Sequence, residues 1–293
     1  MTQITGLRVG TDFSNAAGNA LKRAAALAKQ LGVSRGQVCH AMDPHFVRAI
    51  RDLLPVFAEI EQKRGYQAED DLKAAATALE AASGVSFTRE LEEGHAAELL
   101  VQDSDSATLV VLGAKGYSNM ADVLLGSTAE KVIRQSNGSV LIVRQDAGNA
   151  YQRVLVPVDF SADSTAALNV VRQIAPDAQL HLLHIIAPLP QEHYLQSMVT
   201  DDDVSRYMTH AKEDASEKMA ALIKQAGLDE AKVVTHLDYG YAPTSIEGFA
   251  SRNQFELIAM GKQGHIPLSE WLLGSVTQYV VNHVSQDVLV VKP

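Results

Sequence analysis

The sequence has one cysteine and fewer basic than acidic residues. Cys39 cannot form a disulfide within the chain, which favours a reducing compartment, and in its apolar run it is expected to act as a small buried hydrophobe. Lysine and arginine together number 25 against 35 aspartates and glutamates, a formal charge of −10. This balance argues against a protein that binds nucleic acid by neutralising phosphates over a broad basic face.

Long apolar segments are also missing. No stretch reaches the about 18 consecutive apolar residues that a membrane span requires. The first residues, Met-Thr-Gln-Ile-Thr-Gly, lack the basic flank and apolar core of a leader sequence. From these features and the lone cysteine we expect a cytoplasmic protein with no membrane span.

Catalytic signatures form a third absence. The sequence contains no nucleophile elbow and no metalloprotease or deaminase motif, and its glycine patterns are not Walker A motifs because no Gly-Lys-Ser/Thr closes them. We therefore assign no catalytic residue, and no metal ligand can be named.

What the sequence does contain is a glycine pattern that occurs twice. The first copy reads Gly-Ala-Lys-Gly, nine residues, Gly-Ser-Thr (113–128), and the second reads Gly-Lys-Gln-Gly, nine residues, Gly-Ser (261–275). Each copy follows an apolar run and precedes a helical pattern. The chain is therefore organised around two glycine-lined corners, each placed where a strand is followed by a helix.

Such corners suit phosphate. Glycine permits positive φ and close approach of a ligand to the main chain, and the following helix presents unpaired N–H groups. Ser127 and Ser275 are suitable N-caps and could equally bind an anion. The alternative is that the glycines only shape tight loops. Two copies with identical spacing argue against a chance match.

The rest of the two halves also repeats. Asp12-Phe13-Ser14 after the first apolar run matches Asp159-Phe160-Ser161, and the offset between these aspartates differs by one residue from that between Gly116 and Gly264. Such constancy indicates a duplicated domain. The 293 residues suffice for two compact domains, which we place at 1–146 and 151–293.

Each half alternates short apolar runs with helical patterns. The strands expected in the first half are 7–11, 37–42, 86–91, 109–112 and 140–143, with helices at 15–31, 45–82, 94–105 and 128–135 between them. The second half replays this order, ending with strand 288–291. Short, near-continuous apolar strands indicate parallel sheets covered on both faces, an α/β fold. In doubly wound sheets ligands bind at the carboxyl ends of the strands, where the winding reverses.

The pattern Gly-x2-Gly-x9-Gly-Ser, set between a buried strand and the closing segment SNGSVLIVR (136–144) or SQDVLVVKP (285–293), resembles the nucleotide-binding signature of the universal stress protein family in its two-domain form. The resemblance implies two tandem doubly wound domains, each with a five-stranded parallel sheet in the order 3-2-1-4-5 and helices on both faces. Strands one and four would then end side by side, so that Asp12 shares a cleft with the first glycine corner and Asp159 with the second.

The resemblance also implies the ligand, ATP (or ADP or AMP), with Mg or Mn bridging its phosphates. The strand-one aspartate and the backbone after strand two would hold the nucleoside, and the glycine corner with the following Ser or Thr would hold the phosphates. Carried over, the nucleotide-binding residues are Asp12, Ala41, Gly113, Gly116, Gly126, Ser127, Thr128, Asp159, Ile185, Gly261, Gly264, Gly274 and Ser275. The alternative role for the two aspartates is to cap the helix that follows.

Neither half has the better claim to the ligand. The second matches the family more closely at strand one, with Val-Pro-Val-Asp-Phe-Ser, where the first lacks the proline, but its corner carries Ile266-Pro267 inside the nine-residue stretch. Lys115 and Lys262, between the paired glycines, could approach phosphate or point to solvent. His40 and His184, in the second strands, could join the site or serve as hydrogen-bonded residues of the strand end.

Three functions follow as hypotheses. The first is an adenine-nucleotide-binding stress-response or signalling protein, in which the nucleotide changes conformation or the choice of an unidentified protein partner. The second is a partner-binding or small-ligand carrier module whose glycine corners are structural remnants. The third is a slow ATPase, the most that an enzyme activity would amount to. The apolar fifth strands lie at sheet edges in the inferred order, so the halves are expected to pair as an internal pseudo-dimer, with a homodimer also open.

Overall fold

The computed structural model describes residues 3–42, 57–116, 125–146, 149–188, 200–264 and 272–293. Within these ranges the first half of the chain contributes the strands β1 (Gly6–Gly10), β2 (Arg35–Met42), β3 (Phe87–Glu93), β4 (Thr108–Gly113) and β5 (Ser139–Val143). The second half contributes β6 (Arg153–Pro157), β7 (Gln179–Ile186), β8 (Val233–Tyr239), β9 (Leu257–Gly261) and β10 (Asp287–Val291).

Helices follow most strands in both halves. They are α1 (Asn15–Leu31), α3 (Phe57–Ser83), α4 (Ala96–Val101), α5 (Ser127–Gln135), α6 (Ala162–Ile174), α8 (Asp201–Ala226), α9 (Ala242–Arg252) and α10 (Ser275–His283). The predicted bounds of α1 are confirmed, and α1 and α6 each follow an N-cap serine whose hydroxyl accepts a backbone N–H of the first turn. α4 is shorter than the predicted 94–105 because the chain leaves the helix at Gln102 and Asp103 takes a left-handed conformation (φ 56°).

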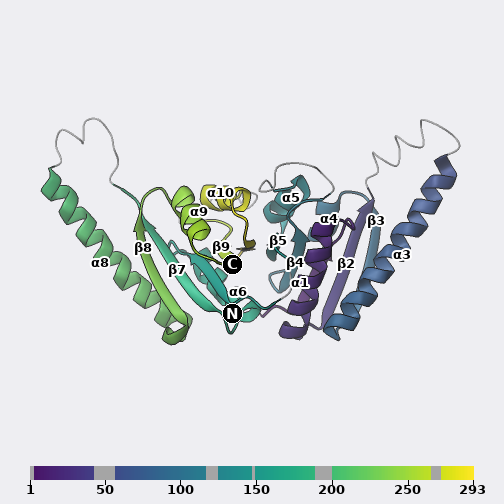
Figure 1. Cartoon of the computed structure of the whole chain (residues 1–293), viewed down its shortest axis with the longest axis horizontal. Helices are drawn as coiled ribbons and strands as arrows, with labels where there is room; N and C mark the ends of the chain where they lie inside the picture. The colour runs from purple at the N-terminus through teal and green to yellow at the C-terminus, as the bar shows by residue number, and fades with distance from the viewer. Residues whose placement is uncertain (1–2, 43–56, 117–124, 147–148, 189–199, 265–271) are drawn as a thin grey trace.

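The described strands form one sheet of ten, in the order β3-β2-β1-β4-β5-β10-β9-β6-β7-β8. Within each half the strands are parallel and follow the expected order 3-2-1-4-5, with β1 lying between β2 and β4. The α/β fold with two doubly wound domains is therefore confirmed. The two sheets are not separate, however, because β5 and β10 join them edge to edge, and Figure 1 shows the two halves side by side.

The joint between the halves is an antiparallel strand pair. Leu289 of β10 faces Leu141 of β5, with one further pair on each side. Both strands are buried at every position. The apolar fifth strands were expected to pair within the chain, and this pairing is what the structure shows. It closes two edges that would otherwise expose open backbone ladders.

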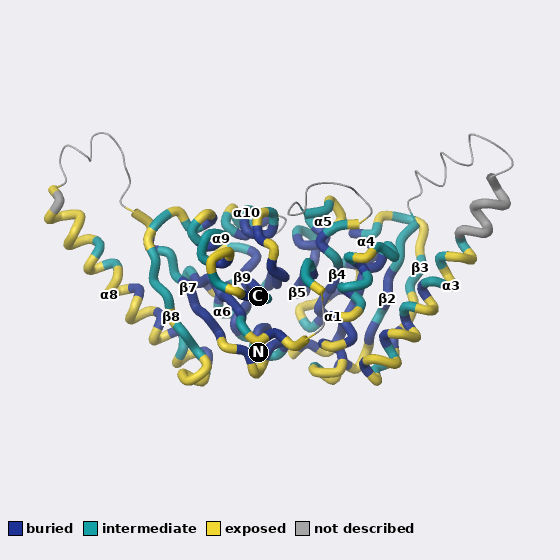
Figure 2. Tube along the Cα trace, in the orientation of Figure 1, coloured by how far each residue is buried: buried dark blue, intermediate teal, exposed yellow. Residues whose placement is uncertain are grey.

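Helices cover both faces of the sheet, and each layer belongs to both halves. One face carries α1 and α3 with α6 and α8, whose buried residues share a hydrophobic core, and the opposite face carries α4 and α5 with α9 and α10 over a second core. Figure 2 shows the central strands buried and the outer surfaces of α3 and α8 exposed. None of the helices in the described ranges combines the length and apolar character that a membrane crossing needs.

Polar contacts also cross the joint. Asp287, at the start of β10, is fully buried and accepts hydrogen bonds from the backbone N–H groups of Arg144 (2.8 Å) and Gln145 (3.0 Å) in the first half. Between α5 and α10, the Gln278 amide donates to Glu130 (3.3 Å). The two halves are thus joined by side chains as well as by the sheet.

Candidate functional site

The turn after β1 positions Asp12. Phe13 takes a left-handed conformation (φ 63°), and Asp12 Oδ1 accepts the backbone N–H of Ser14 at 3.0 Å. Ser14, not Asp12, caps α1, because its hydroxyl accepts the N–H of Ala17. The alternative role of Asp12 as a helix cap is therefore wrong, and its second carboxylate oxygen faces the glycine corner.

The second half repeats this turn. Phe160 has φ 65°, Asp159 Oδ1 accepts the N–H of Ser161 at 3.0 Å, and Ser161 caps α6. The helix-cap alternative is thus wrong for Asp159 as well. The structure brings both aspartates to the ends of the strands that lie beside the glycine-bearing strands β4 and β9.

The corner glycines are needed for close approach. A β-carbon at Gly116 would collide with Asp12 Oδ2, and one at Gly264 would lie 2.6 Å from Asp159 Oδ2. At Gly113 the obstacle is the backbone of Ala16, 2.8 Å away. None of the six corner glycines has a positive φ, so our expectation that they supply left-handed backbone is wrong. Gly116 and Gly264 are small because the strand-one aspartates approach them, and Gly113 and Gly261 because the first turn of the following helix does.

The start of α5 also differs from expectation. The N-cap is Gly126, which has no side chain to accept the first-turn N–H groups, and Ser127 is the first helical residue. The same holds for Gly274 and Ser275 at α10. The prediction that the two serines cap these helices is wrong. The exposed Ser127 and Thr128 hydroxyls stand beside helix N–H groups that no side chain caps, an arrangement that favours an anion.

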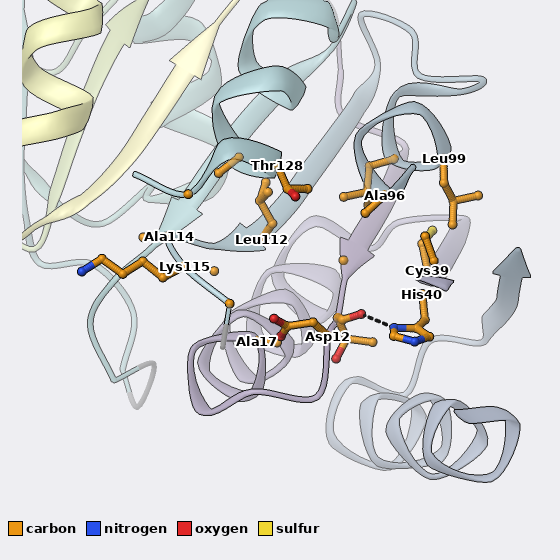
Figure 3. A pocket seen from close by; sticks show the side chains of 18 of the residues that line it. Asp12, Ala17, Cys39, His40, Ala96, Leu99, Leu112, Ala114, Lys115 and Thr128 are labelled. Atoms are coloured by element: carbon orange, nitrogen blue, oxygen red, sulfur yellow. Dashed lines mark hydrogen bonds between the residues drawn. The ribbon is translucent and has the colours of Figure 1, made fainter. Parts of the chain in front are cut away.

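These first-half features converge on one cavity of about 300 Å³ at the carboxyl ends of β1, β2 and β4 (Figure 3). All seven residues predicted for the first site line it: Asp12, Ala41, Gly113, Gly116, Gly126, Ser127 and Thr128. Apolar side chains of α4, including Leu99 and Leu100, form another wall. A concave, mostly apolar pocket with a few converging polar groups is the usual form of a small-molecule site.

His40 was missing from the predicted binding residues but lines the same cavity. Its Nδ1 lies 2.8 Å from the Thr11 carbonyl oxygen, as the dashed line in Figure 3 marks. Because a carbonyl can only accept, Nδ1 carries a hydrogen, and in the neutral imidazole Nε2 is then an acceptor. His184 makes the equivalent contact with the Val158 carbonyl (2.8 Å). The strand-end role considered for both histidines is confirmed.

The two corner lysines point elsewhere. In Figure 3 the Lys115 side chain extends away from Asp12 and His40. Lys262 is buried, with 3% of its surface exposed, and its ammonium donates to the Arg134 carbonyl of the first half at 2.5 Å. Lys262 therefore joins the two halves, and the alternative that it points to solvent is wrong.

The second corner holds a carboxylate that the first lacks. Asp163 Oδ2, in the first turn of α6, accepts the backbone N–H of Gln263 at 2.9 Å, inside the glycine corner. Burial raises the pKa of Asp163; the hydrogen bond from Gln263 opposes that shift, and the charge of Asp159 adds to it. The sequence analysis missed Asp163, although superposing the two halves places it opposite Ala16.

The other second-half candidates occupy equivalent positions. Ile185 lies near the end of β7, Gly261 ends β9, and Gly274 donates its N–H to the Lys262 carbonyl (3.0 Å) as Gly126 does to Ala114 (2.8 Å). Ile266-Pro267, the departure noted in the sequence, lies outside the described residues.

A metal ion in this cavity would need ligands in addition to those that the protein supplies. The described residues contain no group of three or more His, Cys, Asp or Glu side chains placed to hold an ion, and Asp12 is the one carboxylate among the residues lining the cavity. Magnesium commonly binds through one or two carboxylates together with substrate phosphates and water. The cavity therefore fits a metal that arrives with a phosphate ligand.

The fold and this cleft define a tandem doubly wound α/β protein with a cavity at the point where the winding of its first half reverses. The model of the universal stress protein family matches residues 7–144 and again 150–292. The chain therefore belongs to the universal stress protein family, in its tandem two-domain form.

Relatives agree with this assignment. The chain is 26% identical over 294 residues to a universal stress protein of Mycolicibacterium smegmatis, covering 98% of this chain and 97% of the relative. Universal stress protein G of Escherichia coli is 26% identical over 145 residues, 48% of this chain and 99% of that protein. A solved universal stress protein of Archaeoglobus fulgidus shares the fold, with a TM-score of 0.67 at 21% identity over 99% of this chain and 97% of that one.

Proposed function

We propose that the chain binds an adenine nucleotide, ATP in the first instance, in the cavity of its first half, and that it works as a nucleotide-responsive stress protein. The observation that carries the proposal is the convergence of all seven first-half candidates on one cavity of about 300 Å³. They come from three separate strand ends and a helix start, so sequence proximity does not explain their meeting.

The cavity offers different chemistry at its two sides. Toward β2, the backbone at Ala41 and the accepting Nε2 of His40 provide groups suited to the amino and ring positions of a base, and Asp12 provides an acceptor for a ribose hydroxyl. Toward β4, the Gly113–Gly116 corner and the uncapped start of α5 provide N–H donors and hydroxyls suited to phosphates. A divalent ion, Mg or Mn, would bridge those phosphates, with Asp12 as the available carboxylate.

The proposal assigns no catalysis. Among the residues lining the cavity, His40 holds its Nδ1 hydrogen on the Thr11 carbonyl and Asp12 accepts from Ser14. Neither contact forms a nucleophile paired with a base. The expected action is binding that alters the surface presented to a protein partner, and turnover of ATP is not part of the proposal.

The test is the nucleotide content and binding of the purified chain. Nucleotide released by denaturing fresh protein is identified by chromatography, and stripped protein is titrated with millimolar Mg-ATP by calorimetry. We expect bound adenine nucleotide in the wild type and its loss in Gly116→Val/Gly126→Val. Protein that is empty and gives no heat with Mg-ATP would contradict the proposal and leave the partner-binding or carrier hypothesis. Phosphate release is measured in the same samples, and its presence would distinguish a slow ATPase from a protein that only binds ATP.

A further inference from the structure

The two glycine corners differ at one structurally equivalent position. Ala16, in the first turn of α1, is the residue closest to the position of a β-carbon at Gly113, and Asp163, in the first turn of α6, is the residue closest at Gly261. In both halves the backbone carbon of that residue is within 3 Å, at 2.8 Å and 2.9 Å. The main chains therefore approach alike, and the side chain is what changes from a methyl group to a carboxylate.

The Asp163 carboxylate occupies the place that a ligand phosphate would need. Its Oδ2 accepts the backbone N–H of Gln263, between the paired glycines Gly261 and Gly264, at 2.9 Å. An N–H inside this corner is the kind of donor that would hold phosphate. The corner is thus satisfied by an anion that belongs to the protein itself.

The negative charge of the second corner also opposes the binding of a phosphate there, in addition to the position of the Asp163 side chain. A phosphate entering the second corner would come close to two carboxylates, Asp159 and Asp163, whereas the first corner has Asp12 and the methyl group of Ala16. Like charges within a few ångströms repel strongly where water is partly excluded. Burial is the main reason that the pKa of Asp163 is raised, and the charge of Asp159 adds to the shift, whereas the Gln263 hydrogen bond and the charge of Lys262 oppose it.

The charge of Lys262, the cation of the second corner, acts on Asp163 and lowers its pKa, but the ammonium is already hydrogen bonded within the protein. Lys262 turns to the first half, where its ammonium donates to the Arg134 carbonyl. A polyphosphate in the second cleft would therefore have to displace Asp163 from its hydrogen bond without gaining the ammonium of Lys262 in exchange.

We propose that Asp163 acts as a built-in substitute for phosphate that closes the second cleft, so that the chain binds one nucleotide, in its first half. This inference rests on the proposed nucleotide function and determines its stoichiometry. Residue 163, with its counterpart 16, is the position that decides which half accepts a polyphosphate. The backbones of the two corners are similar at this position, so that each half serves as a control for the side chain of the other.

The test exchanges the two side chains. Nucleotide-stripped wild type, Asp163→Ala, Ala16→Asp and the double variant are titrated with Mg-ATP, and the sites per chain are counted by calorimetry and native mass spectrometry. We expect one site in the wild type, two in Asp163→Ala, none in Ala16→Asp, and one in the double variant. Asp214→Ala is the control, because it removes the same charge from an exposed pair with Lys218 on α8, and it should stay at one.

The outcomes separate this inference from the proposed function. Two sites in the wild type would overturn the inference and leave nucleotide binding intact. No site in the wild type and none in Asp163→Ala would overturn both. A single site in both the wild type and Asp163→Ala would show that Asp163 is not what closes the second cleft. Circular dichroism and melting of each variant show whether it is folded, and Asp163→Ala decides the matter by a gain of binding, which misfolding cannot produce.

Discussion

The Tyr151 hydroxyl donates a 2.6 Å hydrogen bond to Oδ2 of Asp287, and both side chains are buried. Tyr151 opens the second half and Asp287 begins its last strand, next to the joint with the first half. Arg23 of α1 completes the cluster, with its guanidinium 4.0 Å from the Tyr151 ring centre and its Nε 3.6 Å from Asp287. The joint is thus fixed by a carboxylate that residues of both halves contact.

Replacing Asp287 with alanine should destabilise the whole chain. The change leaves the Arg23 charge and two backbone N–H groups buried without their acceptor, and removing one partner of a buried ion pair costs about 3–5 kcal/mol. Urea unfolding followed by circular dichroism measures the loss. Asp146→Ala, which breaks an exposed pair with Lys22, should cost at most about 1 kcal/mol. Equal losses in the two variants would contradict a special role for Asp287.

Gly116→Ala should weaken nucleotide binding at least tenfold, about 1.4 kcal/mol. The added methyl group meets Asp12 Oδ2, so either the carboxylate or the corner has to shift. Mg-ATP titration measures the effect. The matched control is Gly18→Ala, in α1, where an added β-carbon meets open space. It should leave binding unchanged and stabilise the helix by about 0.5–1 kcal/mol. Binding that survives in Gly116→Ala would exclude this corner from the site.

Acid should destabilise the second half through a histidine pair. His181 Nδ1 and His236 Nε2 lie 3.0 Å apart between β7 and β8. Burial, with smaller contributions from the charges of Arg153 and His236, lowers the pKa of His181 from 6.5 to about 4. Since the unfolded chain binds this proton more readily, stability falls as the pH drops from about 6.5 toward 4, and is restored above 6.5.

At about 1.4 kcal/mol per pKa unit, the loss is on the order of 2–3 kcal/mol. Urea midpoints measured from pH 7 to pH 4.5 check it. His181→Gln/His236→Gln should lose less stability over this range than the wild type, because the imidazoles with lowered pKa values are gone. A parallel decline in both proteins would assign the acid sensitivity to other groups.

Cys39 should be inert in the folded protein even though it lines the cavity. Its exposed fraction is 2%, and burial raises the pKa of the thiol to about 12. Because the thiolate is the reactive form, a disulfide reagent such as Ellman's should react slowly at pH 8 and fully in urea. Rapid reaction under native conditions would show that the cavity opens to the thiol.

Much of the fold could be predicted because the same sequence pattern occurs in both halves of the chain. Two copies of strand, aspartate, glycine corner and helix specify a repeated α/β unit, and the apolar character of the fifth strands pointed to their pairing. The antiparallel sense and the register of that pairing were not predicted, because they depend on how Leu141 and Leu289 come to face each other. Association of two whole chains stays a prediction.

The sequence predicted which first-half residues meet at one cavity better than it predicted the reasons for their positions. The seven first-half residues meet as expected, but the corner glycines prove to be small for the sake of Asp12 and Ala16 rather than for a left-handed backbone. Asp163 was missed because the sequence was searched for residues that the two halves share. The difference between Ala16 and Asp163 could be interpreted only from the structure, in which Asp163 accepts the Gln263 N–H.

The antiparallel pairing of β5 with β10 has an evolutionary consequence. In a dimer of identical subunits, every substitution appears on both sides of the twofold axis, so neither cleft can lose its ligand while the other keeps it. Here both sides of the axis are encoded in one reading frame, and each cleft can mutate alone. The contrast between Ala16 and Asp163 is a divergence that the fused chain permits, and with the one-site stoichiometry proposed above, the second half would serve as a structural partner for the first.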